Sequence, residues 1–373
     1  MSVILAGLRS TQGRRLAVEQ RTTASFSVRL IATVFSVIGS LVVGAVLLLL
    51  LGEDPLSTYR EMFESSFGNA RVFSQTLVSA APVILTAEAA AIAYRMRLYT
   101  IGQDGQLVLG AIATTGVALW IGPELPGLPM ITIVLVAGAL GGALWALVPA
   151  LSRAYLGTNE VLSTLMMNFI AFGIMSYLIL GSSSFWRDTE SVTPIGATIP
   201  SQAVLPDIFE RADAGIVIAV VVALLLAGAV RFTRWGFELR VVGDSVDAAR
   251  YAGINVARHV AGVLCLSGAL AGLAGAIQVT SVTQSLDPAG LNPGLGIGYT
   301  GIVVAALSRL SLVASIPVAI VMAGLLNAGP ALQLIGIPSA LVFVLQGTIL
   351  LFVAASQFLL SYRVRRAAVE PAP

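Results

Sequence analysis

The chain has 373 residues, of which 57% are hydrophobic and only 11% are charged, with a formal net charge of +2. Soluble domains carry about 25% charged residues, so this composition excludes an ordinary soluble protein and indicates an all-α, polytopic membrane protein. One cysteine excludes an internal disulfide, and one histidine leaves no His/Cys cluster to hold a metal. All 21 basic residues are arginine. The chain therefore lacks a P-loop lysine, which excludes a nucleotide-hydrolysing subunit of that type.

The N-terminal region predicts a cytoplasmic arm followed by a membrane span. Residues 1–29 contain five arginines, and the uncharged run 30–52 is long enough to cross a bilayer. A cleaved signal peptide is the alternative, but its apolar core is about 7 to 15 residues long, whereas this run has 23. We therefore favour a span.

Nine more spans are predicted from the remaining apolar runs. They are about 72–94, 112–121, 128–151, 160–180, 214–230, 259–281, a Gly-rich passage that ends in an apolar run to 308, and two spans within 310–362. Residues 310–362 form a run of 53 residues without a charge, which is too long for one helix. Gly329-Pro330 and residues 336–338 supply the break between the two helices. Glycine and polar residues in the third and eighth spans indicate broken or re-entrant helices.

The arginines orient these ten spans. Seventeen of the 21 fall on predicted inner segments and four on outer ones, as the positive-inside rule expects. Both termini are then cytoplasmic, with residues 30–362 as the transmembrane domain and 363–373 as a cytoplasmic tail. Residues 231–258 form an inner loop, and the polar residues 181–213 form an outer loop.

Glycines predict close helix packing in two places. The seventh span contains Gly262, Gly268, Gly272 and Gly275, and such small residues let helices approach closely in a bilayer. Further on, the glycines of 296–301 match GxGxxG, the pattern of dinucleotide-binding loops. No β-strand precedes them, so we interpret them as a tight packing surface.

The inner loop predicts a short exposed helix. Gly236 and Gly253 bound it, Asp244 is placed as its N-cap, and Asp247 lies in its first turn, where the helix dipole favours an acid. Ser245–Ala252 is the helix we expect. Two or three turns are marginal alone in water, so such a helix needs a docking partner. Arg240, Arg250 and Arg258 are either rim contacts of that partner or plain positive-inside markers.

Several polar residues lie at membrane depth, where they are expensive and usually face a cavity or a partner. Gln103, Asp104 and Gln106 precede the third span, and capping of that span is the alternative role of Asp104. Glu88 lies seven residues before Arg95, on the same helical face but too far for a direct pair, so each is expected to find a partner on another helix.

The fifth span begins with a capping pattern. Thr158 or Asn159 is the predicted N-cap, and Glu160 lies in the first turn. Asn168, eight residues further, either lines a path or bonds a neighbouring helix. The remaining amides, Gln278, Asn327, Gln333 and Gln346, are interpreted as helix–helix contacts.

Three stretches resemble one known family. TIGQDGQLVLGA (100–111), NEVLSTLMMNFIA (159–171) and GFELRVVGDSVDAARYAGINV (236–256) are similar to signatures of permease subunits of bacterial ABC importers for simple sugars and nucleosides. The nucleoside subgroup is the closer match, over roughly 70–360. Thr100 stands where that family usually has Asn, and Asp104 stands where it usually has Glu.

The resemblance implies a permease in the bacterial plasma membrane, with no nucleic-acid partner. It would pair with a second permease, expected to be a paralogue, and receive substrate from an extracytoplasmic lipoprotein. A cytoplasmic ATPase, which would bind the ATP and Mg, would dock on the inner loop, while this chain would bind no cofactor or metal. The coupling residues implied are Asp244, Ser245, Asp247, Ala248, Ala249, Arg250, Tyr251 and Gly253.

The same resemblance implies a nucleoside as substrate, with a simple sugar as the alternative. A nucleoside is neutral, so its site is expected to use amides, hydroxyls and apolar faces. The pathway candidates are Glu88, Gln103, Asp104, Gln106, Asn159, Asn168 and Phe169. Two other classes stay open at this point: a proton-coupled secondary transporter using Glu88 or Asp104, and an intramembrane enzyme acting on lipid-linked sugars.

Overall fold

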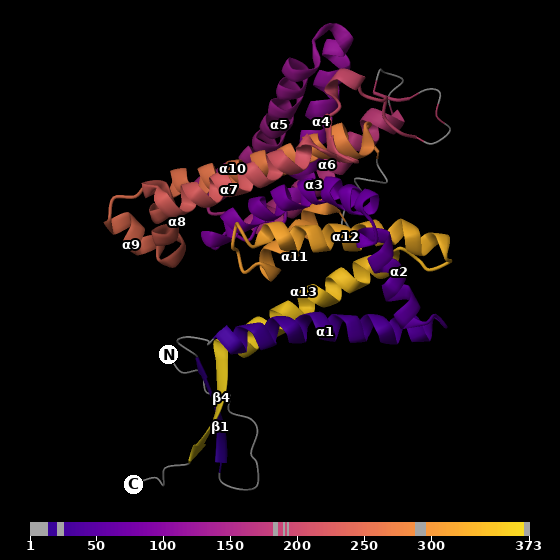
Figure 1. Ribbon diagram of the computed structural model, residues 1–373. Helices are drawn as coiled ribbons and strands as arrows, with labels where there is room; N and C mark the ends of the chain where they lie inside the picture. Colours follow the sequence, from indigo (N-terminus) through magenta and orange to yellow (C-terminus); the bar gives the residue numbers. More distant parts are fainter. Residues whose placement is uncertain are drawn as a thin grey trace. The chain divides into compact units, whose positions relative to one another are not determined.

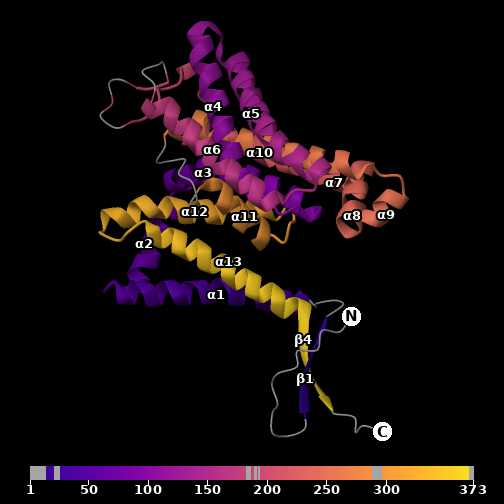
Figure 2. The same ribbon diagram turned by 180° about the vertical axis from the view of Figure 1, so that it is seen from behind.

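Helices make up most of the computed structural model, which describes residues 14–20, 26–181, 186–188, 191, 194–287 and 296–368. Figures 1 and 2 show these helices from two opposite sides. The chain divides into two units by its contacts. The first contains Met1–Pro55 and Phe343–Pro373, and the second contains Leu56–Val342.

The first unit pairs the two ends of the chain. Helices α1 (Phe26–Leu50) and α13 (Ala340–Ser361) lead to strands β1 (Arg14–Gln20) and β4 (Tyr362–Ala368), which pair antiparallel. Ser36 Oγ donates to the carbonyl of Phe352 at 3.1 Å, and Gly39 leaves room for the Phe352 ring. Helix α1 covers most of the predicted first span, which stays a prediction, whereas the strands in the arm and tail were not predicted.

The second unit contains the remaining helices and two short strands. They are α2 (Pro55–Phe67), α3 (Ala70–Arg95), α4 (Gln103–Ile121), α5 (Gly127–Leu156), α6 (Glu160–Ser176), α7 (Ala214–Phe232), α8 (Arg234–Asp244), α9 (Val246–Tyr251), α10 (Val256–Ile277), α11 (Ile297–Leu307), α12 (Ser315–Leu334), β2 (Asp207–Phe209) and β3 (Ala212–Asp213). Single π-helical turns, Tyr177–Gly181 and Gln278–Thr283, extend α6 and α10.

Seven helices of the described chain are long and apolar enough to cross a membrane: α3, α4, α5, α6, α7, α10 and α12. The number rises to eight if Val34–Leu50 and Pro55–Phe67 form one broken span. This confirms a polytopic helical membrane protein, while the total of ten spans stays a prediction.

The helices differ from the predicted spans at several points. Helix α4 begins at Gln103, so the polar residues before the predicted third span form its first turns. Helix α11 has only 11 residues, about 16 Å of helix, too short to cross a bilayer alone, as expected of a broken helix. Helix α2 was not predicted. Pro330 lies inside α12, so the final break is at 335–339 alone.

Glycines bring α4, α5 and α10 into close contact. A Cβ at Gly272 would meet the backbone of Gly138 and Gly142 on α5, and one at Gly275 would meet the Leu107 carbonyl on α4. Gly268 meets α5 in the same way, at Ala146 and Gly142. Three of the four predicted glycines therefore act as expected. The fourth, Gly262, faces open space, with no heavy atom of the described residues within 4 Å of a built Cβ.

Helix α7 connects the two polar ends of the second unit. Asp213 Oδ1 caps α7 by accepting from the Gly215 amide at 2.8 Å, and burial raises the pKa of this aspartate above its usual value. At the other end of α7 the chain turns into α8 and α9. Figures 1 and 2 both show α8 and α9 at the end of α7 and α10 opposite to the described part of 181–213. These two regions were predicted to lie on opposite sides of the membrane, and the direction of α7 agrees.

Candidate functional site

Asp104 lies in the first turn of α4 and caps a different helix, α11. Its Oδ1 accepts from the backbone amide of Gly298 at 2.7 Å, and Cβ atoms built at Gly296 or Gly298 would collide with its carboxylate. A carboxylate at a helix N-terminus satisfies free amides and meets the positive end of the dipole. The alternative prediction, that Asp104 caps its own span, was therefore wrong, because the N-cap of α4 is Gly102. The GxGxxG glycines form the packing surface that we expected, with Gly301 against Thr86.

Glu88, in the middle of α3, is fully buried and reaches the start of α12. Its Oε1 accepts from Ser315 Oγ at 2.5 Å. Arg95 instead donates to the Leu310 carbonyl at 2.7 Å. The prediction of a partner on another helix is confirmed for Glu88, whereas the partner of Arg95 lies in the turn between α11 and α12. No pattern in the sequence identified Ser315.

Asn168 joins α6 to the start of α4. Its Nδ2 donates to the Ile101 carbonyl at 2.8 Å and its Oδ1 accepts from the Gly105 amide at 2.9 Å. Thr164, one turn earlier, accepts from the Ile101 amide at 3.2 Å. Asn168 therefore bonds a neighbouring helix, which was one of its two predicted roles.

The start of α6 follows the predicted capping pattern. Asn159 Oδ1 accepts from the amides of Val161 and Leu162, so Asn159 is the N-cap and Thr158 is not. Glu160 accepts from the Tyr99 amide at 3.2 Å and pairs with Arg153 at 3.2 Å. Asn159 thus has a structural role at the inner end of the helix, apart from the buried groups.

Four pathway candidates, Glu88, Gln103, Asp104 and Gln106, keep buried side-chain atoms that have no hydrogen-bond partner among the described residues. Gln103 is fully buried and neither its Oε1 nor its Nε2 has a hydrogen-bond partner among the described residues. The same holds for Gln106 Oε1. Buried polar groups are normally paired, so these amides call for water or a ligand. Phe169 lies apart from them, with 61% of its surface exposed.

These side chains form a polar layer within the helical core. We use this name for Glu88, Gln103, Asp104, Gln106, Thr164 and Asn168. One oxygen of each carboxylate bonds Ser315 or the N-terminus of α11. The second oxygen of each, like the amide atoms of the two glutamines, has no partner among the described residues. The layer therefore offers unpaired buried polar atoms, mostly oxygens. Among the described residues no group of three His, Cys, Asp or Glu side chains is placed to hold a metal ion.

The inner loop folds into two helices rather than one. We call residues 233–255 the α8–α9 segment. Thr233 caps α8 through the Gly236 amide, and Ser245 caps α9 through the Ala248 amide at 3.2 Å. Asp244 as N-cap was therefore wrong, because it is the last residue of α8. The predicted helix 245–252 is otherwise confirmed, at Val246–Tyr251.

Glycines end α9 and hold α8 close to the bundle. Gly253 has a φ of +76°, and the amides of Gly253 and Ile254 bond the carbonyls of Arg250 and Ala249, which is a Schellman end. Gly236 lies against the Val230 carbonyl on α7, and Gly243 lies against the Arg95 carbonyl on α3. A Cβ at either position would collide with backbone, so α8 folds back tightly on the ends of α7 and α3.

The outer face of α9 is open to solvent. Tyr251 is 98% exposed, Asp247 and Ala248 are exposed, and only Ala249 is buried. Three arginines were predicted either to contact the partner at its rim or to mark only the inner side of the membrane. Arg240 donates to the Val230 carbonyl, and Arg250 pairs with Asp247 at 3.6 Å. Arg258 is exposed. Arg240 is therefore held against α7, while Arg250 stays at the rim of α9.

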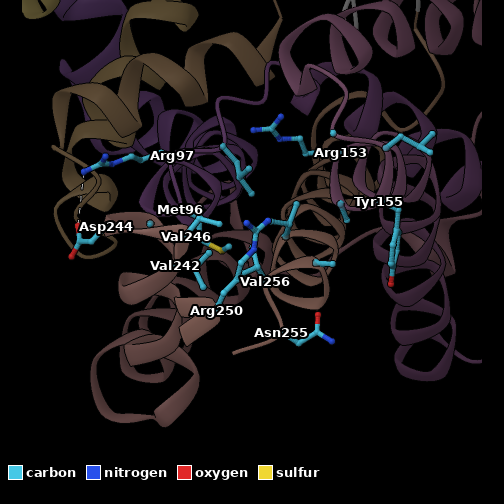
Figure 3. Close-up of a pocket in the computed structure, with 17 residues that line it drawn as sticks. Met96, Arg97, Arg153, Tyr155, Val242, Asp244, Val246, Arg250, Asn255 and Val256 are labelled. Carbon is cyan, nitrogen blue, oxygen red and sulfur yellow. Dashed lines mark ion pairs between the residues drawn. The ribbon is translucent and has the colours of Figure 1, made fainter. Parts of the chain in front are cut away.

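A pocket of about 920 Å³ lies behind α9. Figure 3 shows Arg97, Arg153 and Arg250 around it, with Tyr155 at the inner end of α5 on one side and Val246 of α9 on another. Arg97 reaches Asp244 across 4.0 Å, and both side chains are mostly exposed. The pocket therefore separates α9 from α5.

Comparisons with known proteins agree on one family. Residues 72–354 match the family described as branched-chain amino acid transport system / permease component. The chain is 32% identical to a glucose ABC transporter permease of Haloferax volcanii, covering 89% of this chain and 88% of that protein. It is 32% identical to a nucleoside ABC transporter permease of Lactococcus lactis (89% and 91%) and 30% identical to a guanosine ABC transporter permease of Bacillus subtilis (88% and 93%). A second permease with the corresponding name also matches this chain in Lactococcus lactis, at 27% identity, and in Bacillus subtilis, at 28% identity.

Proposed function

We propose a function from one premise, that the chain belongs to the family of branched-chain amino acid transport system permease components and, with its relatives, to the sugar and nucleoside branch of ABC permeases. It is a multi-pass protein of the plasma membrane and a transport subunit rather than an enzyme. Within that branch, its substrate is a nucleoside, imported with energy from a separate ATPase. This assignment deepens the sequence-based prediction and replaces the proton-coupled and lipid-linked alternatives.

The polar layer is the observation that supports a neutral, amide-recognised substrate. One oxygen of each carboxylate is bonded within the core. The amides of Gln103 and Gln106 and the second carboxylate oxygens keep unpaired atoms in the described part of the chain, which a substrate rich in hydroxyl and amine donors would satisfy. An amino acid would also bring a carboxylate. The helices that cross the membrane carry no basic residue between 98 and 152 to receive it, and a nucleoside needs none. The nucleoside and guanosine permeases among the relatives support the same choice.

A simple sugar is the second candidate. The glucose permease of Haloferax volcanii is as similar to this chain as the nucleoside permease of Lactococcus lactis. A sugar also offers only neutral hydroxyl groups, which amides bind equally well. The two substrates differ in the aromatic base, so competition between them distinguishes the two functions.

The full transporter is proposed to contain four kinds of subunit. The exposed face of α9 docks on the ATPase, which binds ATP and Mg, and a binding protein delivers the substrate from outside. A second permease, a paralogue of this chain, completes the pathway. The pairs of permeases in Lactococcus lactis and Bacillus subtilis support a heterodimer.

Uptake by the assembled transporter tests this function. The chain is co-expressed with an ATPase, a second permease and a binding protein of the same transporter branch from its own source, reconstituted in liposomes, and supplied with labelled guanosine, uridine, ribose or glucose. We expect ATP-driven uptake of a nucleoside that an excess of glucose leaves unchanged. Sugar uptake that nucleosides do not inhibit would establish the second candidate. Uptake by the chain alone on a proton gradient would contradict both.

Substitutions in α4 test the role of the polar layer. Gln103→Leu removes a buried amide that has no partner among the described residues, so stability is expected to hold or rise, while nucleoside uptake falls. Thr115→Val is the matched control, because Thr115 Oγ1 is also buried on α4 without a partner in the described chain. Equal loss of uptake in both variants would show that the glutamine has no special role in substrate recognition.

A further inference from the structure

The pocket behind α9 carries an excess of positive charge. Arg97 follows α3, Arg153 lies in the last turn of α5, and Arg250 belongs to α9, while Asp244 is the one acid among the described residues that line the pocket. Figure 3 shows these side chains around the same space. Three cations against one anion leave an excess of two positive charges. The volume of about 920 Å³ falls within the range of about 300–1,000 Å³ that small-molecule sites occupy.

Two of these arginines are held only loosely by the protein. Arg97 reaches Asp244 across 4.0 Å, and Arg250 reaches Asp247 across 3.6 Å, both at the long end of ion-pair distances. The arginine side chains are 66% and 69% exposed, and pairs of this kind contribute little. Both guanidinium groups can therefore turn toward another anion at small cost.

Arg153 is held more firmly, in an orientation fixed by its neighbours on the chain. Its Nε pairs with Glu160 at 3.2 Å, and its Nη1 donates to the Thr158 carbonyl at 3.1 Å. A guanidinium has five N–H donors in a fixed fork, and these two contacts use two of them. Arg153 therefore offers a positioned set of further donors at the inner end of α5.

The start of α10 also lines the pocket. Val256 and Ala257, the first two residues of that helix, border it together with the N-cap Asn255. The Asn255 side chain accepts from the Arg258 amide at 3.0 Å, further into the first turn. The first amides of a helix have no partner within it and form the positive end of its dipole, where phosphate groups bind. The helix therefore adds to the positive field of the arginines.

An exposed apolar stripe of α5 leads to the pocket. Leu144, Val148, Leu151 and Tyr155 are spaced by four, three and four residues, so they share one face of the helix, and each is between 42% and 70% exposed. Tyr155 and the exposed Leu156 also line the pocket. Helix α5 is long and apolar enough to cross a membrane, and tyrosine is typical of the level of lipid head groups. The stripe is therefore suited to the acyl chains of a lipid.

We propose that this pocket binds the phosphate head group of an anionic phospholipid, with Arg153 of α5 and Arg250 of α9 as its ligands and the acyl chains along the stripe of α5. Planar guanidinium groups bind phosphate oxygens in pairs. The sequence predicts this end of the helices on the cytoplasmic side, where basic pockets between membrane helices bind anionic head groups. A zwitterionic lipid brings a cation with its phosphate, which the arginines disfavour. The bound lipid joins α5 to α9 across the space that separates them.

The lipid and the proposed ATPase use different faces of α9. Val246 and Arg250, four residues apart, line the pocket, whereas Asp247 and Tyr251, also four residues apart, are exposed and lie outside the lining. Residues four apart share one face of a helix. The lipid therefore supports α9 from behind and leaves its outer face open, so this inference goes beyond the proposed function and does not depend on it.

Cross-linking locates the lipid directly. The purified full chain is placed in phosphatidylcholine nanodiscs with a trace of phosphatidylglycerol that carries a photoactivatable group near its head group. We expect cross-links in peptides that contain residues 153–157 or 242–257, and several-fold fewer in Arg250→Gln. Arg258→Gln is the matched control with unchanged yield, because Arg258 is an exposed arginine outside the lining. Cross-links spread evenly over the ends of the helices, or equally frequent in Arg250→Gln, would overturn the proposal.

Hydrogen exchange distinguishes a lipid from a free phosphate. Exchange of the α9 amides is measured in the detergent-purified chain with added phosphatidylglycerol, with glycerol phosphate, which is its water-soluble head group, or with phosphatidylcholine. We expect exchange in 246–251 to slow several-fold with phosphatidylglycerol and to stay unchanged with the other two. Equal slowing by glycerol phosphate would indicate a site for free phosphate, and equal slowing by phosphatidylcholine a site without charge selection. Either result, or no slowing by phosphatidylglycerol, would overturn the proposal.

Discussion

The polar layer and the α8–α9 segment use the same types of residue under opposite conditions. Asp104 and Asn168 are each 3% exposed and bond backbone groups of other helices. Asp247 and Arg250 of α9 are 94% and 69% exposed and bond each other. Water replaces a lost partner in the second case but not in the first. Loss of a partner in the core therefore leaves an unsatisfied buried group, whereas loss of the exposed pair on α9 costs little.

The largest expected effect comes from the glycine packing beneath the polar layer. Gly272→Ala places a Cβ against the backbone of α5, and overpacking of this kind costs about 1–3 kcal/mol or more. We expect a lower thermal midpoint in detergent and a lower yield of monodisperse protein. Gly262→Ala is the matched control on the same helix, where open space and better helix propensity predict no loss. Similar losses in both variants would contradict the packing role.

The next effect tests whether loss of a partner destabilises the polar layer. Asp104→Ala removes the acceptor of the Gly298 amide, and a buried unpaired donor costs about 1–3 kcal/mol. Asp104→Asn keeps an oxygen in the same place and is expected to retain most of the stability. The measurement is the thermal midpoint of the purified chain. An alanine variant as stable as the asparagine variant would show that the cap on α11 contributes nothing.

A smaller effect is expected in the α8–α9 segment. Ser245→Ala removes the N-cap of α9, which typically costs about 1 kcal/mol. Because α9 is short and exposed, the loss is expected as local fraying, read as faster hydrogen exchange of Ala248 and its neighbours, with no change in the global thermal midpoint. Ser245→Asp retains a capping oxygen and is the control. A lowered global midpoint would contradict the contrast between the two regions.

The smallest effect is expected at Arg234, whose side chain is 90% exposed. Arg234→Gln removes the arginine from Glu238 and leaves its contact with the His259 ring in place. Since Arg234 lowers the pKa of Glu238, this carboxylate contributes stability above its unfolded pKa and loses it as the pH falls through the lower folded value. The substitution is expected to move that acid loss to higher pH, measured by hydrogen exchange in α8. A large drop in stability at neutral pH would contradict the small contribution expected of a pair with such an exposed arginine.

Local patterns in the sequence predicted local structure well. Asn159 at the start of α6 and Gly253 at the end of α9 have the predicted roles because capping and φ > 0 depend on residues a few positions apart. Gly268, Gly272 and Gly275 of α10 pack closely as predicted, but their partners on α4 and α5 are distant in sequence and were not predicted. The N-cap of α9 was missed by one residue, since Asp244 and Ser245 are both good caps. Helix α8 was missed because its i,i+4 pair, Arg234 and Glu238, was not read as a helix signal.

The polar layer was identified only as a set of residues. Gln103, Asp104, Gln106 and Asn168 stood out because polar groups are rare at membrane depth. Their partners did not: Glu88 meets Ser315 from 227 residues away, and Asp104 meets Gly298 from 194. The single histidine carried no signal for a link to Glu238, although the two lie 21 residues apart.

By itself, the sequence determined that this is a multi-pass membrane protein, which segments are apolar, where the arginines accumulate and, through its motifs, the permease family. These follow from composition and short-range spacing, because the bilayer demands long apolar helices and an asymmetric charge distribution. The tertiary structure alone decided which helix Asp104 caps, which hydroxyl reaches Glu88 and which ring faces Glu238. Lipid tails are as apolar as the helices themselves, so hydrophobicity does not select neighbours, and close packing and hydrogen bonds between distant residues do.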